Sequence, residues 1–532
     1  MARSPLFASL SRIRRLVHQS EARGLPVTAG LEQEQLSRRQ VLGRGAAVAT
    51  GALMLSSKGA WAAPRGTAPD VGIVGAGLAG LMCGMKLRDA GIVARLYDGN
   101  TRTGGRCATY GGQFGGPVDF GGQVVERGGE LIDNLHKTMI GLSKRYGLTL
   151  EDLEKQPGEI FFYFNGQRVP EATVVDEYRA LVAAIHADLR AISSEPSALS
   201  HNAADLALDH MSLADYLDSR GAGANIRAAL VEAYEAEYGL AAEEQSALNF
   251  LLFIHADKRS RFQPFGVFSD ERYHVVGGNE QIPRGMAAEL PGQIDLGHRL
   301  VAARSLASGS VQLTFDVAGR TVTRTHDLVV MAMPFSTLRE VELDANLGLS
   351  PQKWDAINLL GYGTNAKTMV RFNGTPWRGQ GGNGTAYSDL QNLQTCWETN
   401  PTQATAQQGI LTDYASAARG ASLTTRDLQR NVGRFLNDLD RVFPGAKAAA
   451  SKDARGNVAA YLEPWPLNPL SRGSYTAYTL GQFTTIAGHE GTPSGRLHFA
   501  GEHSDSFYSW QGFMEGACLS GIRAASEIVA RS

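Results

Sequence analysis

A glycine-rich motif near the start of the chain carries the first recognisable chemistry, and it reads Gly75-Ala76-Gly77-Leu78-Ala79-Gly80. The apolar run 71–74 directly precedes it. Gly75 permits a tight turn, Gly77 lets the backbone approach a pyrophosphate, and Gly80 lets the following helix pack closely on the strand. The first turn of that helix offers amide donors and a positive dipole end to the phosphates. The motif therefore predicts dinucleotide binding, with Ala76 also in contact with the ligand.

An acidic residue and a second glycine-containing turn follow. The β-rich run 92–97 ends at Asp98, which is placed to accept hydrogen bonds from the hydroxyls of an adenosine ribose. The next motif reads Thr101-Arg102-Thr103-Gly104-Gly105-Arg106. Its glycines, Gly105 among them, allow the chain to pass close to a cofactor, and Arg106 can compensate diphosphate charge. The alternative interpretation of this second motif is a basic turn on the surface.

These residues need a strand–helix–strand unit to hold them. The runs 71–74 and 92–97 predict two strands, and the residues between them predict the helix that joins the strands. Further along, the stretch 178–252 has helix-like apolar spacing and few helix breakers. With 532 residues, the chain is long enough for two domains.

The C-terminal part of the chain carries two more motifs, and they read Leu497-His498-Phe499-Ala500-Gly501-Glu502-His503 and Trp510-Gln511-Gly512-Phe513-Met514-Glu515-Gly516-Ala517. Together with the turn 101–106, these motifs resemble those of the flavin-containing amine oxidase family, which includes monoamine, polyamine and L-amino-acid oxidases. The resemblance implies FAD as the cofactor, with Gly501, Glu502 and Phe513 among the residues that contact it. The segment 277–283 is similar to another family motif, and the strand around Val301 would then meet the adenine.

Because the matching motifs lie at both ends and in the middle, the resemblance implies an α/β fold in which a Rossmann-like FAD-binding domain is interleaved with an α+β substrate-binding domain. The expected FAD-binding segments are 68–150, 265–345 and 455–531, and the expected substrate-binding segments are 151–264 and 346–454. The apolar run 328–333 looks like the buried strand that returns to the FAD-binding domain.

The resemblance also assigns catalytic residues. Lys367 matches the lysine that holds a water against the reactive nitrogen of the flavin, and Tyr475 and Phe513 match the two aromatic side chains that flank the amine. Trp510 is a further candidate for the wall of the substrate site. A lysine in an otherwise apolar strand is costly to bury without a purpose. The alternative places Lys367 on the solvent face of the strand, and the aromatic residues in an ordinary core.

Three positions depart from the family pattern. Ser474 stands where mitochondrial monoamine oxidases carry the cysteine that bonds the flavin, so we expect FAD to be bound non-covalently. Phe513 lacks the hydroxyl of the family tyrosine, which argues against simple arylalkylamine specificity. Glu130 stands just after the glycine pair where L-amino-acid oxidases place a substrate-binding arginine. Arg472 or another arginine could still bind a carboxylate. Glu130 or Asp133 could bind a second ammonium group, and the alternative is a helix cap or a surface charge.

The resulting prediction is an FAD-dependent oxidase that converts a small amine to an imine, which water hydrolyses to aldehyde and ammonia. Oxygen is the expected acceptor, giving hydrogen peroxide. Within the family, the alternatives are an L-amino-acid oxidase and a dehydrogenase that uses another acceptor. Outside it, the alternatives are a flavin-binding protein without turnover and an enzyme with phytoene-desaturase-like chemistry. The oligomeric state stays open, with a homodimer as the one assembly considered.

Charge and cysteine usage narrow the partners further. The first 62 residues hold nine Lys and Arg against three Asp and Glu, so the rest of the chain is acidic. An acidic surface argues against nucleic acid as a partner and agrees with a cationic substrate. The four cysteines are widely separated and form no metal-binding pattern, so we expect no metal site.

The N-terminal segment 1–62 resembles a bacterial leader with a twin-arginine export signal. Arg38 and Arg39 precede a weakly hydrophobic run, 45–55, which is followed by the small-residue cleavage pattern Ala60-Trp61-Ala62. The run is too short to span a membrane, so a stable anchor is not expected. The resemblance implies that the twin-arginine machinery exports the folded protein to the periplasm or the medium. Cleavage after Ala62 stays open.

Overall fold

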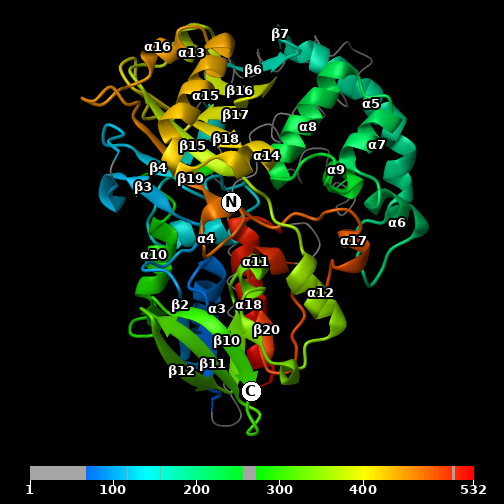
Figure 1. Cartoon of the computed structure of the whole chain (residues 1–532), viewed down its shortest axis with the longest axis vertical. Helices are drawn as coiled ribbons and strands as arrows, with labels where there is room; N and C mark the ends of the chain where they lie inside the picture. The colour runs from blue at the N-terminus through cyan, green and yellow to red at the C-terminus, as the bar shows by residue number, and fades with distance from the viewer. Residues whose placement is uncertain (1–67, 117, 156, 256–270, 506–509, 532) are drawn as a thin grey trace, which may run out of the picture.

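The computed structural model describes residues 68–116, 118–155, 157–255, 271–505 and 510–531. Two lobes stand one above the other in Figure 1: the lower contains the parallel sheet that starts with β1, and the upper contains a larger sheet flanked by helices. The predicted leader, 1–62, lies outside the described residues.

The lower lobe is built on a five-stranded sheet in the order β20-β13-β1-β2-β9, whose paired strands all run parallel. Its strands are β1 (Val71–Val74), β2 (Ala94–Asp98), β9 (Ile294–Leu296), β13 (Leu328–Met331) and β20 (Leu497–Phe499). Each residue of β1 and β13 is buried, as expected for central parallel strands covered on both faces. Three distant parts of the sequence thus build one sheet, which confirms the predicted α/β fold.

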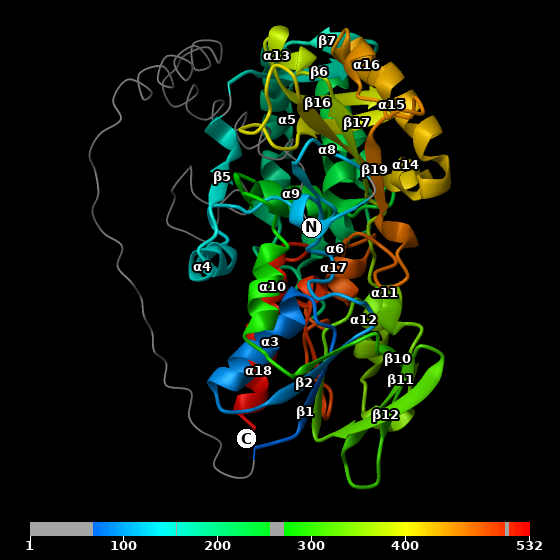
Figure 2. The same cartoon turned by 90° about the vertical axis from the view of Figure 1, so that its left-hand side faces the viewer.

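Two layers cover this sheet. Helices α3 (Leu78–Asp89) and α18 (Met514–Val529) lie side by side on one face, and the sheet of β10, β11 and β12 lies on the other side (Figure 2). That second sheet has the order β12-β11-β10-β14, with β10 (Arg299–Ser305), β11 (Val311–Val317), β12 (Arg320–His326) and β14 (Glu342–Leu343). The three layers fix the turn between β1 and α3, where the glycine motif lies.

The upper lobe is built on a seven-stranded sheet in the order β19-β15-β18-β17-β16-β6-β7. Its strands are β6 (Glu159–Phe164), β7 (Gln167–Val169), β15 (Ala366–Phe372), β16 (Gly382–Leu390), β17 (Leu393–Glu398), β18 (Gly409–Ala415) and β19 (Ala460–Pro464). The amphipathic helix α15 (Leu428–Val442) packs its apolar side chains into the core on one face of this sheet. Phe162, Phe164 and Tyr387 of the same sheet join a second core cluster, which they share with the helices of this lobe.

Strand β19 corrects one predicted boundary. The predicted FAD-binding segment 455–531 includes β19, but β19 pairs with β15 along Ala460–Pro464 and therefore belongs to the seven-stranded sheet. The chain thus leaves the upper lobe later than the motif-based boundary of 455. The motif that suggested the boundary starts only at Leu497, so no sequence signal marked the extra strand.

A layer of helices stands beside the large sheet: α5 (Glu171–Ala191), α6 (Ala203–Asp209), α7 (Leu213–Ser219), α8 (Ala224–Tyr238) and α9 (Ala247–His255). Local signals define their ends. Asn202 caps α6 in a capping box with Asp205, Ser212 caps α7, and Gly239 ends α8 in the left-handed conformation. The helical stretch predicted for 178–252 is confirmed.

Short elements connect these layers. They are β3 (Thr109–Gly111), β4 (Val124–Glu126), β5 (Leu150–Asp152), β8 (Tyr273–Val275), α4 (Lys137–Arg145), α10 (Gln281–Ala288), α11 (Phe335–Leu338), α12 (Pro351–Leu359), α13 (Pro376–Gly379), α14 (Ala417–Ser422), α16 (Ala446–Ala449) and α17 (Gln482–Thr485), with 3-10 turns at 112–114, 153–155, 345–347, 425–427, 465–467 and 502–504. No helix in the described part of the chain is both long and apolar enough for a membrane span.

Candidate cofactor and substrate site

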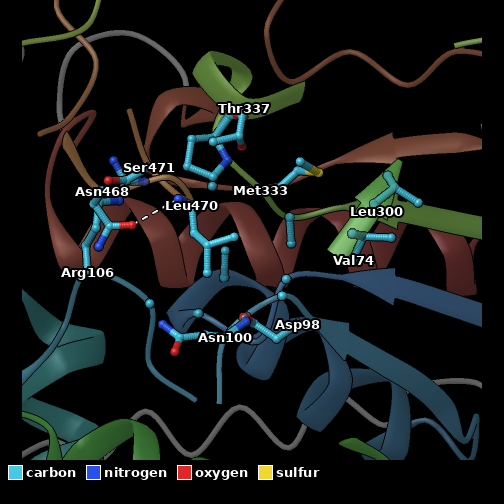
Figure 3. Close-up of a pocket in the computed structure, with 18 of the residues that line it drawn as sticks. Val74, Asp98, Asn100, Arg106, Leu300, Met333, Thr337, Asn468, Leu470 and Ser471 are labelled. Carbon is cyan, nitrogen blue, oxygen red and sulfur yellow. Dashed lines mark hydrogen bonds between the residues drawn. The ribbon is translucent and has the colours of Figure 1, made fainter. Parts of the chain in front are cut away.

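A large pocket opens at the carboxyl ends of the parallel strands of the lower lobe. Its walls enclose about 1320 Å³, including the part open to solvent. Figure 3 shows Asp98 and Asn100 on one side of the pocket and Met333 and Thr337 on the other. Ligands of open α/β sheets bind at this end of the strands. Every predicted cofactor-binding residue except Ala76 and Gly80 lines the pocket directly.

The glycine motif lies at this pocket, and a side chain would be excluded from each of its three glycine positions for a different reason. Gly75 has a φ of +112°, and a Cβ there would lie 2.5 Å from the carbonyl oxygen of Ala332. A Cβ at Gly80 would lie 1.8 Å from the carbonyl oxygen of Gly75, so this glycine lets helix and strand pack closely. A Cβ at Gly77 would meet no protein atom closer than the Cα of Gly105, 4.0 Å away. Protein packing therefore does not require a glycine at position 77, whereas a ligand approaching the start of α3 would.

The fit to a dinucleotide extends beyond the glycines. Gly77 is the N-cap of α3, and no side chain caps this helix, so its first amides face the pocket. Asp98 accepts hydrogen bonds from the backbone amides of Ala76 at 2.7 Å and Asn100 at 2.7 Å. Burial raises the pKa of the Asp98 carboxyl, and both amides oppose that shift. Each carboxylate oxygen keeps a lone pair for a ribose hydroxyl.

Strand β10 reaches the pocket at a β-bulge, which contains Val301. The register between β10 and β11 shifts between Leu300 and Ala302, so Val301 has no cross-strand partner in the ladder. Such bulges expose backbone polar groups that a regular strand would use in pairing. Val301 lines the pocket, where its backbone can meet a planar ring as predicted.

Arg106 holds two distant segments together at one end of the pocket, an end that Trp465, Glu502 and Phe513 also line. Its guanidinium donates to Glu502 Oε1 at 2.8 Å and to the carbonyl oxygen of Ser474 at 2.9 Å. Glu502 also accepts a hydrogen bond from the backbone amide of Thr476. The structure thus shows Arg106 as a link between the turn 101–106 and the segment around Ser474. Its predicted action on a diphosphate stays a prediction.

Lys367 is buried on strand β15 and lines neither pocket. Only 2% of it is exposed, so the alternative of a solvent-facing lysine does not apply. Its Nζ donates to Glu130 Oε2 in a short contact and to the carbonyl oxygen of Gly128 at 3.3 Å. Lys367 is paired directly with Tyr414 on the neighbouring antiparallel strand, which places both side chains on the same face.

The predicted aromatic residues form two groups: Tyr475 contacts Tyr414, and Phe513 contacts Trp510. Tyr475 donates to the carbonyl oxygen of Ala236 at 3.1 Å, and its hydroxyl lies 3.0 Å from that of Tyr414. Phe513 lies on the wall of the large pocket, where its ring packs edge-on against Trp510 and His136.

A second, smaller pocket adjoins Tyr475, and the empty space within its walls is about 340 Å³, including the part open to solvent. Its lining consists of Glu237, Tyr238, Asn249, Tyr475, Thr476, Ala477, Tyr478, Gln511 and Gly512. Gly512 immediately precedes Phe513, which lines the large pocket. Glu237 is fully buried and is the one ionisable carboxylate of the lining.

The two acidic candidates occupy different surroundings from those predicted. Glu130 is fully buried, and its two oxygens bind Lys367 and the indole nitrogen of Trp397. Asp133 is also buried, and its Oδ1 accepts the backbone amide of Leu135 in a turn that precedes α4; the N-cap of that helix is His136, so Asp133 is neither a helix cap nor a surface charge. Neither residue lines either pocket. A role for them in binding a second ammonium group stays a prediction.

Sequence reasoning missed four residues of the site: Trp397, Tyr414, Glu237 and Trp465. Trp465 lines the large pocket and packs against Tyr475. The first three lie on strands β17 and β18 and on helix α8, where no motif marks them. Alternation along β18 could have placed Tyr414 on a buried face, but only the strand pairing places it opposite Lys367.

Burial also perturbs a carboxyl close to Glu130. Burial raises the pKa of Glu126 to about 7, although the backbone amide of Asn279 donates to it at 2.7 Å. Among the described residues, no group of three or more His, Cys, Asp or Glu side chains is arranged to hold a metal ion. All four cysteines are buried free thiols.

A profile of the flavin-containing amine oxidoreductases matches residues 78–529. The chain belongs to this family. The match spans both lobes, from the glycine motif to the end of α18. The protein is therefore a flavin-dependent oxidoreductase that acts on amines, and the family resemblance inferred from the motifs is confirmed.

Individual relatives are distant and differ in what their names say they do. An L-amino-acid oxidase of Naja atra is 23% identical over 86% of this chain and 87% of its own length. Pseudooxynicotine dehydrogenase of Pseudomonas sp. is 24% identical over 94% and 96%. Cyclohexylamine oxidase from Brevibacterium oxydans has the same fold, with a TM-score of 0.71, 20% identity, and coverage of 87% and 99%. These likenesses support the two-domain fold and leave the substrate to the site itself.

Proposed function

We propose that the protein binds FAD non-covalently and oxidises a small primary amine or diamine with oxygen as the acceptor. The overall reaction takes the amine, oxygen and water to an aldehyde, ammonia and hydrogen peroxide. A bound flavin supplies the two-electron transfer from the carbon–nitrogen bond. The observation that carries the proposal is the burial of Lys367 beside Tyr414, whose hydroxyl meets that of Tyr475 in the wall of the second pocket.

The residues of the chain orient the substrate and keep water out of the site. Tyr475 and Phe513 supply aromatic faces that orient an amine, and their burial keeps water away. Lys367 can hold a water by hydrogen bonding, as the family resemblance implies. Ser474 replaces the residue that would form a covalent flavin link, and its hydroxyl donates to Asn365 Oδ1. We therefore expect acid precipitation of the protein to release all FAD into the supernatant.

The charge of the second pocket favours an amine over an amino acid. Its lining contains Glu237 and neither Lys nor Arg. An ionised Glu237 would repel a substrate carboxylate and attract an ammonium. Arg472, the arginine considered for a carboxylate, pairs with Glu340 at 2.5 Å and is half exposed. It lines neither pocket.

An L-amino-acid oxidase is the second candidate, because relatives with that name match most of the chain. Product analysis separates the two. Purified holoprotein is incubated with monoamines, diamines and L-amino acids, and aldehyde, 2-oxo acid and peroxide are measured. Aldehyde with peroxide is the expected result. A 2-oxo acid as the only product would establish the second candidate, and turnover with a dye but without peroxide would indicate a dehydrogenase.

Two further predictions rest on the sequence alone. Export of the folded protein depends on the leader 1–62, and fusion of this leader to a reporter would test it. A double-lysine variant of Arg38 and Arg39 should block that export.

A homodimer is the assembly considered for this protein. The mass of the holoprotein in solution would test it.

A further inference from the structure

Glu130 is joined to two residues that come from different strands of the large sheet. Its Oε2 receives the Lys367 ammonium, and its Oε1 receives the Trp397 indole N–H at 2.9 Å. The backbone next to it is fixed as well, because the side-chain amide of Asn279 donates to the carbonyl oxygens of Gly129 at 2.9 Å and Glu130 at 2.7 Å. The carboxylate is thus held from the lower lobe and binds side chains of the upper lobe.

Trp397 continues the contact toward the substrate side. Its ring packs against the ring of Tyr414, with centroids 5.5 Å apart and an interplanar angle of 62°. The hydroxyl of Tyr414 lies 3.0 Å from that of Tyr475, which lines the second pocket. The Lys367 ammonium also lies 5.6 Å from the centre of the Trp397 ring. A continuous series of contacts therefore runs from Lys367 through Glu130, Trp397 and Tyr414 to Tyr475.

Because these groups are buried, the positions of the side chains in this series depend on Glu130. A buried carboxylate and a buried ammonium each need a partner, because neither has water to solvate it. The lysine side chain has four rotatable bonds, so its Nζ has a defined position only where several acceptors fix it. Glu130 supplies the charged acceptor, and Gly128 supplies the other.

We propose that Glu130 is a positioning residue that fixes Lys367 and the series Trp397–Tyr414–Tyr475 relative to each other. This inference rests on the proposed function, because it concerns the residues that orient an amine. Glu130 acts through Lys367 and Trp397, and it contacts neither pocket. This positioning role differs from the binding of a substrate ammonium that the sequence suggested for Glu130, because both carboxylate oxygens of Glu130 already accept hydrogen bonds within the protein.

The structure offers a matched control in the same sheet. Glu398 is also buried, and it accepts the indole N–H of Trp377 at 3.1 Å and the guanidinium of Arg378. It therefore repeats the arrangement of a carboxylate between a tryptophan and a cation. Neither Glu398 nor its two partners lines a pocket. Glu398→Gln removes the same kind of charge as Glu130→Gln but does so away from the site.

The test is a double-mutant cycle on the FAD holoprotein. The rate of anaerobic flavin reduction by the best amine is measured for the wild type, Glu130→Gln, Lys367→Met and the double variant. We expect Glu130→Gln to slow reduction by about 10- to 100-fold in the wild-type background. In the Lys367→Met background the same change should slow it by less than about twofold. Equal factors in both backgrounds would overturn the proposal.

The control and a second variant keep the test decisive. Glu398→Gln should leave the reduction rate within about twofold of the wild type, and an equal slowing there would show a general loss of stability instead. If Glu130→Gln does not load FAD, Trp397→Phe replaces it, because it removes only the N–H donor and keeps a ring. Trp397→Phe should slow reduction by at least about threefold, and an unchanged rate would overturn the proposal.

A readout independent of turnover separates this inference from the proposed function. The visible absorbance of oxidised FAD should shift in Glu130→Gln and Trp397→Phe but not in Glu398→Gln. If no amine reduces the wild type, the proposed function fails, and the cycle is repeated on reoxidation by air after chemical reduction. A cycle without coupling, together with unchanged spectra, would overturn the positioning role by itself.

Discussion

The nucleotide end and the chemical end of the site are built in opposite ways. The nucleotide end uses glycines, backbone amides and one half-buried aspartate from residues that are close in sequence. The chemical end uses the charged and aromatic side chains of residues 130, 367, 397, 414, 475 and 513, which six separate segments bring together. The first end depends on the absence of side chains, and the second depends on their exact partners.

This difference predicts two kinds of failure. A side chain added at the nucleotide end should prevent binding of the cofactor altogether. A side chain altered at the chemical end should leave the cofactor bound and change the rates. The following predictions test this division, beginning with the largest expected effect.

Gly77→Val should abolish formation of the holoprotein. The added side chain would fill the space that the start of α3 leaves open to the pocket, without meeting protein atoms first. Gly433→Val is the control, because it adds the same side chain to helix α15 where nothing lies within 4 Å. Flavin absorbance per protein should fall to background in the first variant and stay normal in the second. Normal flavin content in Gly77→Val would refute the assignment of the nucleotide end.

Lys367→Met should keep FAD bound and slow flavin reduction or reoxidation by about 100-fold. The loss follows from removal of the buried cation beside Tyr414 and Glu130. Lys353→Met is the matched control: Lys353 is also fully buried, and it donates to backbone carbonyls near Glu490 away from both pockets. Stopped-flow absorbance measures both rates. Wild-type rates in Lys367→Met would remove the lysine from the mechanism.

Glu126→Gln should change how stability depends on pH. Burial raises the pKa of Glu126 from 4.5 to about 7, so the folded protein binds this proton more tightly than the unfolded chain does. The contribution of the protonated carboxyl is complete below pH 4.5 and is lost as the pH rises toward 7. Between these values the wild type should lose up to about 3 kcal/mol that the variant keeps. Denaturant unfolding at pH 5 and pH 8 measures the difference, and parallel pH trends would contradict it.

Tyr414→Phe should have the smallest effect. It removes the hydroxyl that meets Tyr475, while Tyr475 keeps its bond to the carbonyl oxygen of Ala236. We expect a loss of about 1 kcal/mol in stability and less than about a threefold change in turnover. Tyr163→Phe removes a surface hydroxyl bonded to the carbonyl oxygen of Gly166 and serves as the control. A loss of flavin in Tyr414→Phe would contradict the division between the two ends.

The same comparison explains what could be predicted from the sequence. The turn at Gly75, the ribose acid Asp98 and the parallel sheet follow from local patterns, because each depends on neighbouring residues. Lys367 and Tyr475 could be found only by resemblance. Trp397 and Tyr414 could not be found, since their roles depend on strand register, which no local pattern fixes here. The domain boundary at 455 fails for the same reason, because only the pairing of β19 with β15 shows that 460–464 belongs to the large sheet.

The most direct test of the central claim is anaerobic bleaching of the bound flavin by a panel of monoamines, diamines and L-amino acids, followed by readmission of air. We predict fast bleaching by an amine, with one peroxide formed per flavin on reoxidation. Bleaching by L-amino acids alone would contradict the proposed substrate class. No bleaching by any member of the panel would contradict the proposed function.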